Sequence, residues 1–335
     1  MIEVQDLHKQ FRVYKHHRGR LAALRNLVTR EFRPVQAVDH ISFSVAAGEL
    51  VGYLGPNGAG KSTTLKILTG LLVPDGGQVR VNGFVPWLER RRYVANIGAV
   101  FGQRTTLWWD LPVIESFDLL QHIYQLRPGQ FQRNLADFTQ LLELEPFLNT
   151  PVRSLSLGQR MRADIAAALL HNPPLLFLDE PTIGLDIVAK ERIRQFIRRI
   201  NQERGTTVIL TTHDLQDVEK LCERVMIIDS GRLLFDGKLE TLRNRFGNQR
   251  RLVVDFAEEY PDPTIADSQI VAQEGLRVTY QFERTKLTAS ELIGRLTARF
   301  RIQDLAVQEA AIEDTIRRIY EEKLLHQPLL NQSAP

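Results

Sequence analysis

Residues 55–62 read Gly55-Pro56-Asn57-Gly58-Ala59-Gly60-Lys61-Ser62 and satisfy the pattern G-x-x-x-x-G-K-[ST]. An apolar run over residues 50–54 leads into this stretch, and a helical pattern over residues 63–72 follows it. Glycines permit the tight backbone curvature that brings N–H groups close to phosphate oxygens, and the helix presents its positive N-terminal end to the anion. The stretch therefore predicts a phosphate-binding loop, in which Lys61 reaches the β- and γ-phosphates of a nucleotide and the Ser62 hydroxyl binds Mg²⁺.

Two adjacent acids, Asp179 and Glu180, end a second apolar run over residues 175–178. Carboxylates at the end of a buried strand need partners, because an unpaired charge is costly to desolvate. We expect Asp179 to hold Mg²⁺, directly or through water, and Glu180 to act as the general base or at least to orient the attacking water. His213 follows a third run, residues 207–212, and is either an ordinary surface or core histidine or a residue aimed at the γ-phosphate.

Apolar, strand-like runs alternate with helical patterns on both sides of these acids. This alternation predicts an α/β fold with a mostly parallel sheet covered by helices. Residues 111–170 contain no convincing strand and several prolines. We therefore expect a nucleotide-binding domain over residues 1–245, with a nested helical subdomain over about residues 104–172. A small α+β appendage, residues 246–335, follows and ends in a polar tail. Its helix over residues 290–300 has Ser290 as a candidate cap.

The composition is that of an ordinary globular protein, with 335 residues, 43% of them hydrophobic and 25% charged, and a formal net charge of +3. The single cysteine, Cys222, has no partner for a disulfide within the chain. No apolar run approaches the roughly 20 residues needed to cross a bilayer, and the first residues lack the pattern of a signal peptide. We therefore expect any role at a membrane to be exerted from the cytoplasmic side through a partner.

Residues 155–160, Leu-Ser-Leu-Gly-Gln-Arg, resemble the LSGGQ signature of the ATP-binding cassette (ABC) proteins. Further matches occur in the order that the family has them, and the resemblance covers about residues 1–240. Residues 181–186 resemble the D-loop of the family, and Gln103 resembles its Q-loop glutamine. His213 resembles the switch histidine. Phe11 resembles the aromatic residue that stacks on adenine, and Tyr14 is a second candidate for that role.

This resemblance implies an ABC ATPase cassette that works as a head-to-tail dimer, either a homodimer or a heterodimer. Each ATP would lie between the phosphate loop of one subunit and the signature segment of the other. The chemistry of the signature segment fits this arrangement, because Ser156 and the N–H groups around Gly158 can donate to a γ-phosphate at the N-terminal end of a helix. Leu157 departs from the family pattern at the first signature glycine. It can still offer its backbone N–H if the backbone angle allows.

ATP and Mg²⁺ are thus the expected ligands, and the expected contacts come from three groups of residues. The catalytic residues are Lys61, Glu180 and His213. The Mg²⁺ ligands are Ser62, Gln103 and Asp179. The nucleotide contacts are Phe11, Gly55, Pro56, Asn57, Gly58, Ala59, Gly60, Lys61, Ser62, Thr63, Gln103, Ser156, Gly158 and Gln159.

Residues 68–83 are similar to exporters whose ATPase and permease are separate chains, such as drug, polysaccharide and viologen exporters. The similarity implies a subunit that powers export from the cytoplasmic face of the inner or plasma membrane. Its partners would be a membrane-spanning permease and a second ATPase subunit, with no nucleic acid. The alternative is a soluble ABC ATPase in translation or DNA repair, but such proteins usually carry a second cassette or a long coiled-coil or zinc-hook insertion. A third possibility is a regulatory nucleotide-binding module without catalytic activity, but the presence of Lys61, Glu180 and His213 argues against it.

Two further segments predict contacts with a partner. Residues 15–33 carry six Lys or Arg and one acid, with leucines at helical spacing. They are expected to lie against the permease or an anionic membrane face, or else to form a solvated basic loop whose leucines pack onto the cassette. Trp108 and Trp109 are either anchors for the permease or core residues.

Overall fold

The computed structural model divides into two compact units, residues 1–236 and 237–335. A six-stranded sheet in the order β5-β6-β7-β3-β8-β9 forms the centre of the first unit. The structure describes residues 1–14, 32–102, 104–246, 249–283, 285–309, 316 and 319. The first five strands in this order run parallel. In sheet order the strands are β5 (Ile97–Phe101), β6 (Leu175–Asp179), β7 (Thr207–Thr212), β3 (Leu50–Leu54), β8 (Arg224–Asp229) and β9 (Arg232–Lys238).

The central strands β6, β7 and β3 are buried along almost their whole length. Parallel strands covered by helices on both faces are apolar throughout, so the continuous runs in the sequence are explained by this position. The helices that follow these strands are α2 (Lys61–Leu68), α7 (Ile187–Arg204) and α8 (Leu215–Leu221), with the short α3 (Arg90–Val94) before β5. The predicted α/β class with a parallel sheet is confirmed.

A second, antiparallel sheet in the order β2-β1-β4 packs onto the same core. Its strands are β1 (Ile2–Tyr14), β2 (Phe32–Val45) and β4 (Gly76–Val81). Apolar residues alternate along them, so that Ile2, Val4 and Leu7 of β1 are buried with Tyr53 of the central sheet. Residues 15–31 of the predicted basic segment lie outside the described residues.

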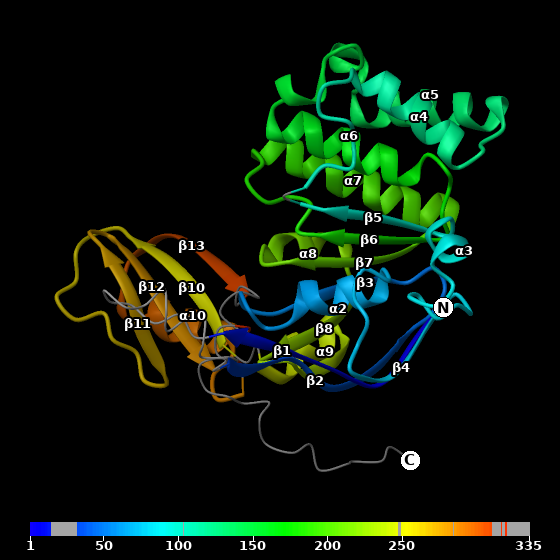
Figure 1. Cartoon of the computed structure of the whole chain (residues 1–335). Helices are drawn as coiled ribbons and strands as arrows, with labels where there is room; N and C mark the ends of the chain where they lie inside the picture. The colour runs from blue at the N-terminus through cyan, green and yellow to red at the C-terminus, as the bar shows by residue number, and fades with distance from the viewer. Residues whose placement is uncertain are drawn as a thin grey trace, which may run out of the picture. The chain divides into compact units, whose positions relative to one another are not determined.

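Between β5 and β6, residues 104–174 form helices and turns (Figure 1). The elements are α4 (Val113–Ile123), α5 (Pro128–Leu142), α6 (Leu157–Leu169) and two short 3₁₀ turns, Glu145–Phe147 and Val152–Ser154. In Figure 1 the three α-helices lie beyond the β5 edge of the sheet, and α6 packs against β5.

The second unit has its own antiparallel sheet in the order β11-β12-β10-β13 and its own buried core. Its elements are α9 (Leu239–Phe246), β10 (Gln249–Phe256), β11 (Ser268–Glu274), β12 (Arg277–Glu283), α10 (Ala289–Arg299) and β13 (Ile302–Glu309). The prediction of Ser290 as the helix cap is wrong. Thr288 caps α10, and its hydroxyl and backbone form a reciprocal capping box with Glu291.

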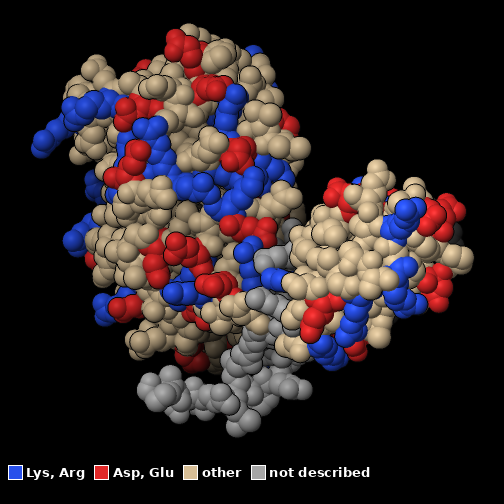
Figure 2. Space-filling model, turned by 180° about the vertical axis from the view of Figure 1, so that it is seen from behind, with Lys and Arg blue, Asp and Glu red and all other residues tan. Residues whose placement is uncertain are grey.

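No helix within the described part of the chain is long and apolar enough to span a bilayer. On the face of the molecule that Figure 2 shows, Lys and Arg side chains lie among Asp and Glu side chains.

Candidate functional site

Backbone conformation and close packing both restrict the glycines of the turn between β3 and α2. Gly58 and Gly60 have φ angles of 83° and 108°, which side-chain-bearing residues rarely adopt. A Cβ atom on Gly60 would lie 2.2 Å from the Ala37 carbonyl oxygen, and one on Gly55 would lie 2.4 Å from the Ile228 carbonyl oxygen. The three glycines of this turn are therefore required by its backbone curvature and by the neighbouring backbone at Ala37 and Ile228.

The Lys61 side chain folds back over this turn. Its Nζ donates hydrogen bonds to the carbonyl oxygens of Gly55 at 2.6 Å and Pro56 at 3.1 Å. Burial lowers the pKa of Lys61, while the negative charges of Glu180 and Asp179 oppose that shift. An ammonium held in this way lies close to where the turn can bind phosphate, and it can exchange its carbonyl partners for phosphate oxygens.

Asp179 at the end of β6 faces the hydroxyl of Ser62 at the start of α2. Its Oδ1 accepts hydrogen bonds from Thr211 Oγ1 at 2.5 Å and from Ser62 Oγ at 3.3 Å. A hydroxyl and a carboxylate are the oxygen ligands that Mg²⁺ takes in nucleotide sites, so these two residues fit that ion. Gln103, the third predicted ligand, lies outside the described residues.

The next residue, Glu180, contacts His213. His213 Nδ1 lies 3.2 Å from Glu180 Oε2, and both side chains are partly exposed to solvent. Glu180 has a φ angle of 54°, a left-handed conformation that is uncommon for a residue other than glycine. Its backbone N–H donates to the Thr211 carbonyl oxygen at 3.0 Å, which holds the strained residue in place. The structure thus brings Lys61, Asp179, Glu180 and His213 together at the carboxyl ends of neighbouring parallel strands, where ligands bind in such sheets.

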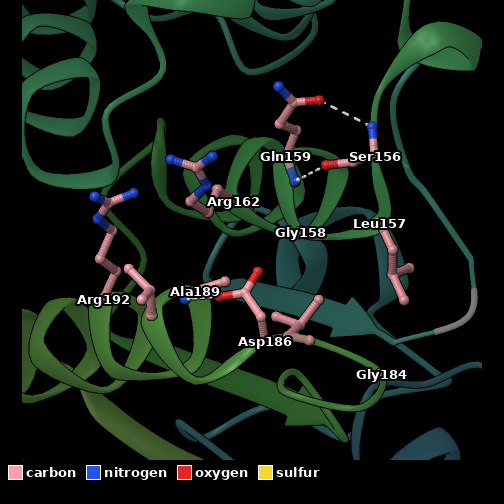
Figure 3. Close-up of a pocket in the computed structure, with 11 residues that line it drawn as sticks. Ser156, Leu157, Gly158, Gln159, Arg162, Gly184, Asp186, Ala189 and Arg192 are labelled. Carbon is pink, nitrogen blue, oxygen red and sulfur yellow. Dashed lines mark hydrogen bonds between the residues drawn. The ribbon is translucent and has the colours of Figure 1, made fainter.

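The signature segment begins α6 through a reciprocal capping box. Ser156 Oγ accepts from the Gln159 N–H at 3.2 Å, and Gln159 Oε1 accepts from the Ser156 N–H at 2.9 Å (Figure 3). With Leu157, Gly158 and Arg162 these residues line one side of a groove of about 480 Å³. The other lining residues are Gly184, Leu185, Asp186, Val188, Ala189 and Arg192. No residue of the phosphate loop lines this groove.

Leu157, the departure from the family signature, packs on the D-loop of the same chain. Its Cδ2 lies 2.9 Å from the position that a Cβ atom on Gly184 would take, and Gly184 has a φ angle of 70°. The leucine is the first residue of α6, so its backbone N–H is not used within the helix. The larger side chain is therefore accommodated by a glycine opposite it, and the backbone donor is retained.

Phe11 is exposed on β1, and Lys9 Nζ lies 5.7 Å from the centre of its ring. None of the described contacts joins this ring to the phosphate loop. β2, which pairs with β1, nevertheless passes close to that loop, since a Cβ atom on Gly60 would meet the Ala37 carbonyl oxygen. The side chain of Tyr14, the reserve candidate, lies outside what the structure describes.

Sequence reasoning missed Asp164, a buried acid in the middle of α6. Its Oδ1 accepts from Thr105 Oγ1 at 2.8 Å, the Thr106 N–H at 2.9 Å and Thr106 Oγ1 at 3.1 Å. Burial raises its pKa, and the hydrogen bonds oppose that shift. The carboxylate ties the segment that follows residue 103 to the helix that begins at the signature. Asp164 is the single acid in the otherwise apolar run 163–170, and that pattern could have identified it as a buried carboxylate that needs partners.

A second missed residue, Asp217, joins three parts of the site. Its carboxylate accepts from Arg194 Nε on α7 at 2.6 Å, from Thr212 Oγ1 at 3.2 Å, and from Thr182 Oγ1 of the D-loop. Both Asp217 and Arg194 are buried. Through the hydrogen bonds from Thr182 and Thr212, the Asp217 carboxylate thus connects the D-loop to the segment that carries His213.

A strand, a glycine-rich turn and a helix, with a lysine from the turn and paired acids from a neighbouring strand, define a P-loop nucleoside-triphosphatase. Residues 38–183 match the family model described as ABC transporter. The chain is 34% identical over 208 residues to ABC transporter ATP-binding protein NatA of Bacillus subtilis (strain 168), an alignment that covers 62% of this chain and 84% of NatA. It belongs to the ABC transporter ATP-binding proteins and is an ABC-type ATPase.

Two further comparisons support the same family assignment. Nod factor export ATP-binding protein I of Ralstonia nicotianae (strain ATCC BAA-1114 / GMI1000) is 36% identical over 242 residues, which are 72% of this chain and 73% of that protein. The dimeric structure of the ATP-binding cassette MJ0796 in a post-hydrolysis state, bound to ADP and Pi, superposes with a TM-score of 0.60 at 28% identity. It covers 71% of this chain and 99% of MJ0796. The family and the fold class that the sequence predicted are confirmed.

Proposed function

We propose that this chain is the motor subunit of an ABC exporter, acting as a head-to-tail dimer on the cytoplasmic face of a membrane beneath a separate permease. The observation that carries the proposal is the division of the site within one chain. The phosphate loop, paired acids and His213 gather in one place, while Ser156 lies in a groove that no phosphate-loop residue lines. A signature segment that donates to phosphate needs a phosphate from elsewhere, and a second copy of the cassette supplies it.

In this reading, ATP binds with its phosphates on residues 55–63 and its adenine against Phe11. Lys61 would exchange its carbonyl partners for phosphate oxygens, and Ser62, Asp179 and Gln103 would hold Mg²⁺. The metal would neutralise charge on the β- and γ-phosphates. Glu180 takes a proton from the attacking water or orients it, and His213, 3.2 Å from Glu180, holds that carboxylate toward the γ-phosphate.

The signature contributes from the other subunit. Ser156, Gly158 and Gln159 form the N-terminal end of α6, whose free N–H groups and positive dipole favour a γ-phosphate. Because these contacts are made only when ATP is bound, they give the closed dimer an affinity that hydrolysis removes. That cycle of closing and opening is the mechanical step that would drive the permease.

The proposed sharing of each site between two chains can be tested by mixing two inactive variants, Ser156→Arg and Lys61→Ala. Each mixed dimer has one site with both lesions and one intact site. Random pairing should therefore restore on the order of a quarter of wild-type ATPase activity. ATPase assays on the mixture, with native mass spectrometry to count mixed dimers, measure the effect.

The matched control places both changes in one chain and mixes it with wild-type chains. Mixed dimers then have no intact site, so activity should fall below that of the wild-type chains alone. If mixed dimers form, yet the first mixture stays inactive and the second keeps the activity of its wild-type chains, each site is self-contained and the shared site is refuted.

The helical subdomain offers a surface for the permease. Trp108 and Trp109 are 39% and 49% exposed, so neither is a core residue, and Arg160 lies 5.5 Å from the centre of the Trp109 ring. Leu119 and Ile123 of α4 are also exposed. Exposed indoles are common anchors in protein interfaces, and this segment directly follows Gln103 in the chain.

Trp109→Ala should lower ATP-driven transport several-fold and weaken co-purification with the permease, while the basal ATPase activity of the isolated subunit stays unchanged. The reason is that the described contact of the indole joins it to Arg160, which is not among the residues proposed to bind ATP. Leu88→Ala is the matched control, because Leu88 is a 74% exposed apolar residue outside the helical subdomain. Equal transport by both variants would contradict the docking surface.

A further inference from the structure

Three potential metal ligands lie together on the β1–β2 ladder. Asp6, His8 and His40 each offer one ligand atom, and these three atoms all lie within 4.8 Å of one another. We propose that they form a binding site for a divalent transition-metal cation of the zinc class. None of the three residues belongs to the set proposed to bind ATP or Mg²⁺.

Two irregularities of the ladder bring these side chains together. The register between β1 and β2 shifts between Val4 and Leu7 and again between Leu7 and Lys9. Asp6 and His40, which lie at these shifts on opposite strands, both have a φ angle of 52°. Bulges re-aim side chains out of the regular alternation, so residues that a straight ladder would separate can meet here. The Asp6 N–H donates to Ser42 Oγ at 2.9 Å, which holds the bulged residue.

The His8 ring is held in place on both sides. Its ring stacks on that of His40 with centroids 4.6 Å apart, and a Cβ atom on Gly76 would lie 2.2 Å from its Cε1. His8 Nδ1 lies 3.3 Å from the Asp6 carbonyl oxygen. Metal-binding histidines usually donate one ring N–H to such an acceptor, which leaves the other nitrogen free for the ion.

The ligand set selects the class of metal. Two imidazoles and one carboxylate suit Zn²⁺, with water in the remaining position, whereas Mg²⁺ and Ca²⁺ prefer oxygen ligands alone. A Zn–ligand distance of about 2.1 Å places tetrahedral ligand atoms about 3.4 Å apart. His40 Nδ1 and Asp6 Oδ1 lie 2.7 Å apart without the ion. Small side-chain rotations would therefore admit it, and both side chains are exposed enough to make them.

A nearby acid, Asp75, is not counted among the ligands. Its carboxylate accepts from Lys9 Nζ at 2.7 Å and from the Gln10 N–H at 2.7 Å, and its own N–H donates to the His8 carbonyl oxygen at 3.0 Å. Asp75 thus fixes the backbone beside His8. Three protein ligands remain, which is the number that zinc sites with a bound water have.

The test is calorimetric titration of the full-length, tag-free, chelator-treated protein with Zn²⁺ in buffer without nucleotide or Mg²⁺. We expect one Zn²⁺ site that weakens at least tenfold in each of Asp6→Asn, His8→Gln and His40→Asn. Asparagine is chosen at residues 6 and 40 because it tolerates the left-handed backbone found there. The rise in melting temperature that Zn²⁺ causes in the wild type should disappear in the same variants, whose melting temperatures without metal report whether they fold.

Two controls remove other histidines. His122→Gln changes a histidine on α4, and His16→Gln/His17→Gln removes the adjacent pair that could bind a metal by itself. Both should bind Zn²⁺ as the wild type does. The proposal is overturned if the wild type binds no Zn²⁺, if folded variants at residues 6, 8 and 40 keep wild-type affinity, or if either control variant loses the same site.

Discussion

Glu180→Gln should lower ATP turnover by about two to four orders of magnitude, the usual contribution of a positioned general base. The substituted amide keeps the size of the side chain but cannot accept the proton of the attacking water. Lys61, Ser62 and Asp179 are untouched, so the affinity for ATP with Mg²⁺ should stay within a few-fold of wild type. Because we propose that hydrolysis releases the closed dimer, this variant should accumulate as a nucleotide-bound dimer.

Steady-state ATPase assays measure the first effect, equilibrium binding of a fluorescent ATP analogue the second, and light scattering with ATP the third. Glu203→Gln is the matched control, since it makes the same change in an exposed ion pair with Arg199 on α7. Such pairs contribute little, so the control should behave as wild type. Wild-type turnover by Glu180→Gln would remove Glu180 from its proposed role, and loss of ATP binding would show that the residue acts earlier.

The residues proposed to bind phosphate could be picked out from the sequence because their signal is local. Residues 55–62 combine the glycines, the lysine and the hydroxyl that one turn and one helix end require, and the flanking runs give the strand and the helix. The pair Asp179 and Glu180 was predictable for the same reason, since two charges directly after a buried strand need a partner. The structure places Ser62 and Thr211 as partners of Asp179.

Contacts between distant segments were not predictable in this way. Asp164 and Asp217 read as ordinary helix residues, because the threonines that bond Asp164 lie more than fifty positions away and Arg194 lies on another helix. The short strands β5, β8 and β9 were not recognised as separate elements, since five to seven residues of mixed pattern resemble many loops. The cap of α10 was misplaced by two residues, because Thr288 and Ser290 both favour caps and only the bond to Glu291 distinguishes them.

The buried pair of Asp217 and Arg194 leads to the largest expected effect on stability. Asp217 is 0% exposed and Arg194 is 4% exposed. Asp217→Ala would leave the guanidinium buried, with only the more distant Glu191 at 3.5 Å and Asp214 at 3.7 Å to compensate it. Breaking such a pair from one side typically costs about 3–5 kcal/mol, and these weaker partners place the expected loss near the lower value.

Urea unfolding can measure that loss in the first unit alone, because all three tryptophans, Trp87, Trp108 and Trp109, lie in it. Asp137→Ala is the matched control. It removes the acid from the Asp137–Arg204 ion pair, in which the acid is 57% exposed, and should cost less than about 1 kcal/mol.

Replacing both partners, as Asp217→Leu/Arg194→Leu, should restore much of the lost stability, since two apolar side chains leave no charge to desolvate. It should not restore ATPase activity, because the hydrogen bonds from Thr182 and Thr212 to Asp217 are what join the D-loop to the segment that carries His213. A double variant that regains both stability and activity would show that the ion pair only stabilises the fold. A double variant that is stable and inactive supports a positioning role for Asp217.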